Sequence, residues 1–351
     1  MAAYTTIDDP TAFFQAKTYT GNGSTQSITL NGLNNMQPDW VWIKQRDETR
    51  GHNIQDSVRG ATKYIDSRST GAEATVANTL TAFDSNGFSL GSYDDVNKSS
   101  QTYVAWNWKA GTSFTNDASS TGIGTIDSTG SVNTDAGFSI ISYTGNATTN
   151  AKVAHGLGVA PSMMIVKKRN GAFNWGIYHK SLTAHKLITF TTNAPDDDAS
   201  YWNDVEPTSS VFNLGSGALT NGSGSTMIAY CFAEKQGYSK FGSYTGNGNA
   251  DGTFVYTGFK PAWVLIKWVG GTSDWYIYDN KINPFNVMSK VFAPNIANAE
   301  ITTSRLMDFT SNGFKNRGSG NTTNASGENY IYMAFAENPF VTSTGVPATA
   351  R

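Results

Sequence analysis

The sequence predicts an all-β protein. Its apolar stretches are short, about four to eight residues, and rich in Val, Ile, Tyr, Phe and Trp, which is typical of strands. Asn-Gly, Thr-Gly and Gly-Ser pairs separate these stretches and indicate tight turns. No window keeps the helical spacing of apolar residues over three turns. Many short strands in units of about 100 residues indicate antiparallel sandwiches or jelly rolls.

The chain repeats itself three times. The motif Tyr-Thr-Gly-Asn begins at Tyr19, Tyr143 and Tyr244, and each copy is followed by a Pro that opens an apolar strand ending in Lys. These strands are Pro38–Lys44, Pro161–Lys167 and Pro261–Lys267. Gly and Asn tolerate the positive φ of a turn, and Pro costs least as the first residue of a strand. Each copy therefore predicts a strand, a turn and a Pro-led strand.

Further landmarks follow in the same order in each copy. Trp175–His179 matches Trp275–Asp279, and His52–Asp56 is a divergent version of the same segment. Each copy then closes on an apolar strand: Tyr103–Trp108, Met227–Glu234 and Ile331–Glu337. The shared order predicts that the copies have the same strand order. We also expect Trp175 and Trp275 to be buried, each in the core of its own copy.

These landmarks predict three tandem homologous β-sandwich or jelly-roll-like domains, over residues 13–110, 137–236 and 237–340. Residues 111–136 are rich in Gly, Ser and Thr and predict a linker, which would make the first domain the more independent one. Residues 1–12 and 341–351 have no strand pattern. We expect this N-terminal arm and C-terminal tail to become ordered against a neighbouring chain.

The composition narrows the classes of function. Only 15% of residues are charged, 13% are aromatic, and the formal net charge is −2. The surface must then be neutral and polar, as in proteins that bury against neighbours or bind neutral ligands such as sugars. No basic stripe indicates binding to nucleic acid, and no run of about 18 apolar residues indicates a membrane span. Asp8 and Asp9 stand where a signal peptide would be basic or apolar.

The sequence contains no recognisable catalytic, cofactor-binding or metal-binding motif. The candidate carboxylates for acid–base chemistry are Asp94, Asp95, Asp196–Asp198 and Glu206. The run Asp196–Asp198 fits either a solvated loop or a calcium loop. Among the four histidines, only His179 and His185 approach a metal-ligand spacing. Cys231 lies inside an apolar strand and indicates a buried small side chain. We therefore expect no catalytic residue, no cofactor and no metal.

Recurrence across the copies is a further argument against catalysis. Asp56, His179 and Asp279 occupy the same repeat position. A catalytic group would be tied to one copy, whereas a short polar side chain that caps a turn explains all three residues.

One segment resembles a known family. His155–Pro161 followed by Ile165–Lys167 is similar to a motif common in the tail and fibre proteins of tailed phages. With the repeated landmarks, the pattern resembles a repeated domain of unknown function in phage virion structural proteins, many from phages of marine bacteria and cyanobacteria. The first copy departs at Asn31–Asn34 and the third at Tyr256–Phe259. The resemblance implies a location on the virion and brings no catalytic residues.

We therefore expect a non-enzymatic virion structural protein, made in the host cytoplasm. The leading hypothesis is a tail fibre or tail-tip appendage that binds host surface glycan. The alternative is a capsid decoration or head-fibre protein, because the chain has no heptad region and no long shaft; a minor alternative is a phage glycan hydrolase. The low charge and many aromatic residues predict a homo-oligomer, and family analogy predicts a trimer in contact with other virion proteins. The composition predicts neither nucleic acid binding nor membrane insertion.

Overall fold

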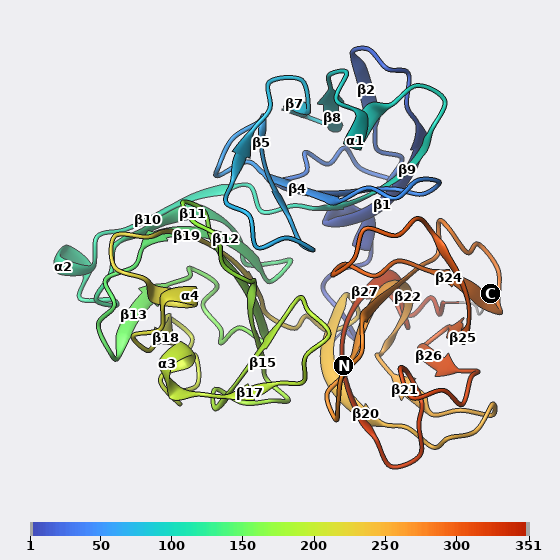
Figure 1. Cartoon of the computed structure of the whole chain (residues 1–351). Helices are drawn as coiled ribbons and strands as arrows, with labels where there is room; N and C mark the ends of the chain where they lie inside the picture. The colour runs from blue at the N-terminus through green and yellow to red at the C-terminus, as the bar shows by residue number, and fades with distance from the viewer. Residues whose placement is uncertain (1–2, 349–351) are drawn as a thin grey trace.

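The structure is a computed structural model that describes residues 3–348, and its regular secondary structure is almost entirely antiparallel strands. Figure 1 shows three lobes arranged around a common centre, with the N-terminal lobe in blue and teal, the second in green and the third in orange and red. This architecture confirms the all-β prediction.

The first lobe spans residues 14–108 and has a main sheet of order β1-β9-β3-β4-β5-β6 and a smaller sheet of order β2-β8-β7. A 3-10 helix, η1 (Pro10–Ala12), precedes it. Its elements are β1 (Phe14–Thr20), β2 (Gln26–Thr29), β3 (Trp40–Gln45), β4 (His52–Asp56), β5 (Lys63–Asp66), β6 (Ala74–Thr75), β7 (Leu80–Asp84), β8 (Gly87–Leu90), α1 (Asp94–Asn97) and β9 (Thr102–Trp108).

The second lobe spans residues 112–232 and has a main sheet of order β10-β11-β12-β19-β14-β15-β16-β17, with β13 and β18 paired separately. Its elements are β10 (Thr112–Asn116), α2 (Ala118–Thr121), β11 (Ser128–Asn133), β12 (Phe138–Thr144), β13 (Ala151–Ala154), β14 (Met163–Lys168), β15 (Gly176–His179), β16 (Lys186–Thr189), β17 (Asp196–Asp197), α3 (Ala199–Trp202), β18 (Val211–Leu214), α4 (Ala218–Asn221) and β19 (Thr226–Phe232).

The third lobe spans residues 239–339 and consists of two four-stranded sheets, of order β20-β27-β22-β23 and β21-β26-β25-β24. Its strands are β20 (Ser239–Thr245), β21 (Phe254–Tyr256), β22 (Phe259–Trp268), β23 (Trp275–Asp279), β24 (Met288–Val291), β25 (Ile301–Thr310), β26 (Gly313–Asn316) and β27 (Asn329–Pro339).

Four strands of each main sheet follow one order: β1-β9-β3-β4, β12-β19-β14-β15 and β20-β27-β22-β23. The Pro-led strand lies in each case between the closing strand and the strand of the Trp or His landmark. The register pairs Trp40 with Asp56, Met163 with His179, and Trp263 with Asp279. Positions in the three lobes can therefore be compared residue by residue.

Each Pro-led strand is buried on both faces. In β3, Val41 and Ile43 pack between the two sheets of the first lobe, whereas Trp40 and Trp42 point to the centre of the molecule. The strands β14 and β22 show the same alternation. A strand with one solvated face would alternate apolar and polar residues, so the second buried face explains why these stretches are continuously apolar.

The three lobes share one aromatic core at the centre. Ring centroids lie 4.7 Å apart for Trp40 and Tyr230, which join the first and second lobes. Phe190 and Trp275 lie 5.3 Å apart between the second and third lobes, and Phe14 and Phe335 lie 5.2 Å apart between the first and third. The side chains that cover the inner face of each sheet therefore come from the other two lobes.

The shared core corrects two expectations from the sequence. Trp175 and Trp275 are buried, but each lies against another lobe: the Trp175 indole donates to the Asp66 carbonyl at 3.0 Å and the Trp275 indole to the Thr189 carbonyl at 2.9 Å. The first lobe is also not more independent than the others. The apolar inner face of its sheet would be exposed to water if the lobe stood alone.

Residues 111–136 do not form the predicted linker. They contain β10 and β11, which pair with each other and extend the second lobe's sheet beyond β12. Val132 and Ile126 are buried in the core of this lobe. Ser and Thr are compatible with strands, and these few apolar side chains anchor a segment whose composition otherwise resembles a loop.

The chain ends also differ from the expectation that they order against a neighbour. Within residues 3–12, Ile7 is buried in the shared core and the Thr5 hydroxyl donates to the Gln236 carbonyl at 2.7 Å. In the tail, the Ser343 amide donates to Asp8 at 2.6 Å. Residues 1–2 and 349–351 lie outside the described residues. The described parts of both ends thus contact this chain itself.

Buried lysines connect the lobes in a closed ring. Lys44, Lys167 and Lys267, the last residues of the Pro-led strand motifs, are fully buried, and burial lowers the pKa of each amine to about 8. Lys44 donates to the Ala297 carbonyl of the third lobe at 3.2 Å. Lys167 donates to the Thr70 carbonyl of the first lobe at 3.0 Å, and Lys267 to the Thr192 carbonyl of the second lobe at 3.0 Å.

Each lysine also donates to a carbonyl of its own lobe, from Arg50, Phe173 and Ser273 respectively. An amine has three donors and no acceptor, so it satisfies several carbonyls that lie together where loops from two lobes meet. The Ala297, Thr70 and Thr192 carbonyls also accept a backbone N–H, so the amine gives each of them a second hydrogen bond. A buried carbonyl without a donor costs free energy, and the amine supplies a donor to the Arg50, Phe173 and Ser273 carbonyls.

We expect Lys167→Met to lower the free energy of unfolding by roughly 2–3 kcal/mol, because it removes the donor to the buried Phe173 carbonyl and the second of two donors to the Thr70 carbonyl. Lys186→Met is the control: its side chain is 43% exposed, and its ion pair with Asp197 at 3.7 Å is a surface pair worth roughly 0–1 kcal/mol. Urea denaturation of both variants measures the difference. Equal effects of the two substitutions would contradict a stabilising role for the buried amine.

Candidate functional site

The repeat position of Asp56, His179 and Asp279 is structural in all three lobes. Each side chain accepts a backbone N–H of the turn that follows it: from Arg59 at 2.8 Å, from Ser181 at 3.2 Å and from Lys281 at 2.6 Å. The turn-capping role suggested by the sequence is thus present in the structure.

The same three side chains have a second role that the sequence did not reveal. Asp56 accepts the Tyr230 hydroxyl at 2.7 Å, His179 donates to the Tyr332 carbonyl at 3.1 Å, and Asp279 accepts the Trp106 indole N–H at 2.5 Å. Each contact crosses to the next lobe, in the cycle first to second to third to first. Burial raises the pKa of Asp279 to about 6. These groups hold lobes together and face no open cavity.

The other candidate residues also have structural partners. Asp95 pairs with Arg50 at 3.1 Å, and Glu206 accepts the Ala184 amide at 2.8 Å. Asp196 and Asp197 are exposed in β17, and Asp198 caps α3 through the Ser200 amide at 2.7 Å. Within residues 3–348, no group of three or more His, Cys, Asp or Glu side chains is placed to hold a metal ion.

The remaining His and Cys residues are likewise structural or exposed. Burial lowers the pKa of His155 to about 4, and this ring contacts the Thr208 carbonyl at 3.1 Å. His185 is exposed and lies 3.2 Å from Asp204. Cys231 is buried, and burial raises the pKa of its thiol to about 12, so the thiolate needed for nucleophilic attack is scarce at neutral pH. Across the described part of the chain, no helix is long and apolar enough to span a membrane.

A surface feature distinguishes the third lobe. On its strand β21, Phe254 is 44% exposed and Tyr256 is 51% exposed, while Val255 between them is buried. Tyr4 and Phe340 lie beside them, with their ring centroids 6.3 Å apart. We call these four residues the aromatic patch.

Hydrogen bonds position two of the four rings in the aromatic patch. The Tyr4 hydroxyl donates to the Gly258 carbonyl at 2.7 Å and lies 3.2 Å from the Tyr256 hydroxyl. Phe254 stands opposite Lys315 on β26, and Lys315 pairs with the exposed Asp251 at 2.5 Å. The patch thus presents aromatic rings next to hydrogen-bonding groups, which is the combination that binds amphipathic ligands.

The fold does not require aromatic side chains at these positions. Val255 pairs with Phe314, and its equivalents Ile28 and Val153 pair with Phe88 and Phe212. The residues that flank the buried one are Phe254 and Tyr256 in the third lobe, Ser27 and Thr29 in the first, and Lys152 and Ala154 in the second. The sequence carried this signal, but it becomes visible only when the strand register is known.

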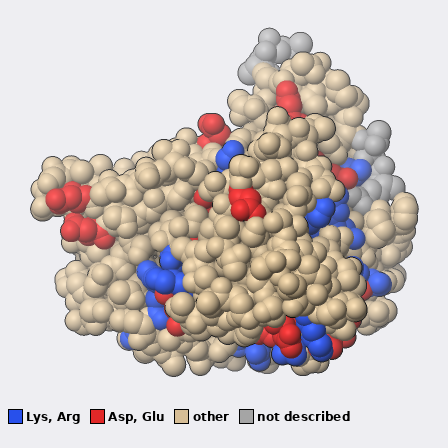
Figure 2. Space-filling model, turned by 90° about the horizontal axis from the view of Figure 1, so that it is seen from above, with Lys and Arg blue, Asp and Glu red and all other residues tan. Residues whose placement is uncertain are grey.

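The rest of the surface is poor in charge. On the face shown in Figure 2, Lys, Arg, Asp and Glu side chains occur in small scattered groups, and most of the face is uncharged. The view agrees with a composition of 15% charged residues.

The fold defines a three-lobed β protein that carries the exposed aromatic patch on its third lobe. The chain belongs to the family described as Domain of unknown function (DUF7483), which matches residues 9–339. The match spans all three lobes as one family domain. A comparison with curated proteins finds no match.

The buried side chain of His179 should make the stability of the protein depend on pH. Burial lowers the pKa of His179 from its ordinary value of 6.5 to about 4, so between these pH values the unfolded chain binds a proton that the folded chain does not. This term makes the protein less stable as the pH falls from about 6.5 to about 4. The wild-type protein should lose free energy of unfolding between pH 7 and pH 4, and His179→Gln should make this loss smaller by up to about 3 kcal/mol. Urea denaturation at both pH values measures the loss.

The control for this experiment is His185→Gln, because the His185 side chain is exposed. This variant should keep the wild-type pH dependence. A His179→Gln variant whose stability falls with acid as steeply as the wild type would contradict the role of the buried neutral imidazole.

Proposed function

We propose that this chain is a non-enzymatic structural protein of a bacteriophage virion, a tail-fibre or tail-tip appendage that binds host surface glycan. The location on the virion is supported by the resemblance of His155–Pro161 and the repeated landmarks to phage virion proteins. Glycan binding is supported by the sparsely charged surface and the aromatic patch. The aromatic patch is the single observation that carries the binding role.

The chemistry of the aromatic patch favours a sugar. The C–H faces of a pyranose ring stack on aromatic rings, and its hydroxyl groups need donors and acceptors at the rim. Phe254 and Tyr256 supply the rings, and Lys315 and Asp251 supply the polar rim. Because the hydroxyl of Tyr256 is held by Tyr4, little conformational entropy is lost on binding.

We further propose that the three lobes are homologous sandwich domains that arose by duplication, and that the protein acts as a homo-oligomer, a trimer, attached to other virion proteins. Exposed apolar side chains such as Leu33 and Phe285, which are 88% and 79% exposed, favour burial against other chains. Imaging of virions labelled with antibody to this chain tests the location. Label at the tail supports an appendage, and label over the capsid supports the alternative decoration protein.

We expect Phe254→Ala and Tyr256→Ala each to weaken glycan binding at least tenfold without changing the unfolding midpoint, because both side chains are exposed. Binding is measured on an array of bacterial surface polysaccharides. Lys152→Ala, at the position of the second lobe equivalent to Phe254, is the matched control and should bind as the wild type does.

Two results would count against the proposal. A wild-type protein that binds no polysaccharide on the array would remove the binding role. Release of new reducing ends from a bound polysaccharide would show a hydrolase instead of a binding protein.

A further inference from the structure

A cavity of about 540 Å³ lies at the surface of the third lobe, between β25 and the loop over residues 317–322. Arg305 lines the cavity from β25, and Arg317, Gly318 and Gly320 line it from the loop. The volume corresponds to about eighteen waters in the liquid, which is enough for a ligand the size of a sugar with a charged group attached.

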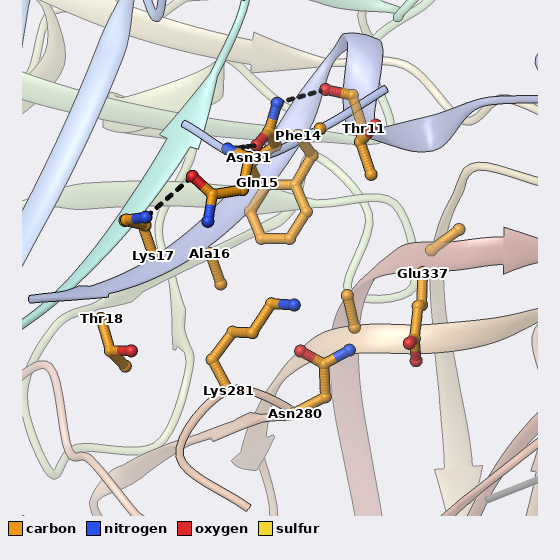
Figure 3. A pocket seen from close by; sticks show the side chains of 13 residues that line it. Thr11, Phe14, Gln15, Ala16, Lys17, Thr18, Asn31, Asn280, Lys281 and Glu337 are labelled. Carbon is orange, nitrogen blue, oxygen red and sulfur yellow. Dashed lines mark hydrogen bonds between the residues drawn. The ribbon is translucent and has the colours of Figure 1, made fainter. Parts of the chain in front are cut away.

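The charge in this cavity differs from that in the cavity between the first and third lobes, which Figure 3 shows. Lys17 and Lys281 line that other cavity together with Glu337. Among the described residues, the cavity on the third lobe is lined by two guanidinium groups and by no Asp or Glu. Guanidinium groups bind oxyanions through charge-assisted hydrogen bonds, so the wall of this cavity favours an anion.

The guanidinium of Arg305 is held in place by neutral groups. Its Nε donates to the Thr322 hydroxyl at 2.5 Å and its Nη1 to the Thr303 hydroxyl at 2.9 Å, while Cζ lies 4.6 Å from the centre of the Tyr276 ring. Its Nη2 has no hydrogen-bond partner among the described residues and is accessible to solvent. The group is therefore oriented, and one of its nitrogens is free to donate to a ligand.

The charge of Arg305 is also not neutralised by a carboxylate. Arg317 pairs with Asp308 at 2.7 Å and lies 3.6 Å from Asp251, which also pairs with Lys315 at 2.5 Å. Within residues 3–348, no carboxylate lies within ion-pairing distance of Arg305. Arg305 is thus the cation of this group whose charge remains available to attract an anion.

The loop that faces Arg305 has an equivalent in each of the other lobes. In every copy an Asn side chain donates to the carbonyl of the Gly six residues earlier: Asn97 to Gly91, Asn221 to Gly215, and Asn324 to Gly318. This shared contact aligns the three loops residue by residue.

The aligned loops differ in their backbone donors. In the first two lobes, the amide of this Gly and the amide two residues later both donate to backbone carbonyls. The pairs are Gly91 with Thr79, Tyr93 with Asn78, Gly215 with Tyr201, and Gly217 with Ser200, at distances between 2.7 and 3.0 Å. In the third lobe the equivalent amides, of Gly318 and Gly320, have no acceptor among the described residues. Two backbone donors in the cavity wall are therefore open to a ligand.

The cation is specific to the third lobe as well. The carbonyl that lies closest to the aligned Gly belongs to Asn78, Ser200 and Ser304 in the three lobes. The residue that follows is Thr79 in the first lobe, Tyr201 in the second and Arg305 in the third. The fold therefore requires neither the guanidinium nor the open amides at this place, and both occur together in the third copy.

We propose that this cavity binds a tetrahedral oxyanion, the phosphate or sulfate group of an ester. Arg305 supplies the charge and the Nη2 donor, and the amides of Gly318 and Gly320 donate to further oxygens of the same group. A carboxylate has two oxygens in one plane and would leave some of these donors unused. The cavity borders the polar rim of the aromatic patch, because Asp251 pairs with both Lys315 and Arg317, but it does not depend on the proposed virion function.

Calorimetric titration of the full chain with four related probes tests the proposal: glucose 6-phosphate, glucose 6-sulfate, glucuronate and glucose. We expect one of the two esters to bind at least tenfold more tightly than glucuronate and glucose, and more weakly as the salt concentration rises. The tighter of the two esters identifies the oxyanion. Glucuronate binding as tightly as both esters would overturn the tetrahedral oxyanion, and glucose binding as tightly would overturn the role of the charge. No binding of either ester at millimolar concentration would overturn the site.

Two variants locate the binding within the molecule. Arg305→Gln removes the charge and should weaken binding of the ester at least tenfold. Thr322→Asp places a carboxylate beside the Nε of Arg305, where the Thr322 hydroxyl now lies at 2.5 Å, and should weaken binding as strongly because it neutralises the guanidinium. The aligned residue of the first lobe is Asp95, which pairs with Arg50 at 3.1 Å, so the loop accommodates an Asp at this position.

The second variant separates loss of binding from loss of folding. Thr322→Asp should keep at least the wild-type unfolding midpoint, because it adds an ion pair. Lys186→Gln removes an exposed amine in the second lobe and is the control, which should bind the ester as the wild type does. A folded Thr322→Asp variant that binds as tightly as Lys186→Gln would overturn the assignment, whatever the result for the aromatic patch.

Discussion

The structure depends on the burial of both faces of three sheets. Each main sheet packs one face on the second layer of its own lobe and the other face on the shared aromatic core. Fully burying a large apolar side chain contributes roughly 1.5–3 kcal/mol, and the inner faces hold many such side chains. Separating the lobes would expose Trp40, Tyr230, Trp275 and their neighbours at once. The lobes therefore stabilise one another, although each has a layered core of its own.

The buried core imposes a second requirement. Loops of different lobes lie against one another, and some of their backbone carbonyls are buried between the lobes. The ring formed by Lys44, Lys167 and Lys267 supplies donors at these places. The contacts of Asp56, His179 and Asp279 run around the centre in the opposite cycle. The polar groups that recur in every copy thus form hydrogen bonds between the lobes. The exposed aromatic residues Phe254 and Tyr256, in contrast, differ from their equivalents in the other two copies and make no contact between main sheets.

The sequence predicted the strands, their turns, the repeated Pro-led motif and the burial of Cys231, because these follow from local patterns. It did not predict the shared core. Continuous apolar runs such as Trp40–Ile43 indicate two buried faces, but they do not say which segment covers the second face. The strands β10 and β11 were missed because Ser- and Thr-rich edges resemble loops. The orientation of Arg305 depends on contacts between residues far apart in the sequence, which no local pattern reports.

We infer from the shared core that the three lobes fold as one cooperative unit. Hydrogen–deuterium exchange of the full chain, followed by mass spectrometry on peptides from β3, β14 and β22, measures this cooperativity. We expect the amides of all three strands to exchange through one opening, with a free energy equal to that of global unfolding. Exchange of β3 through an opening that costs several kcal/mol less, with β14 and β22 still protected, would show that the first lobe unfolds independently.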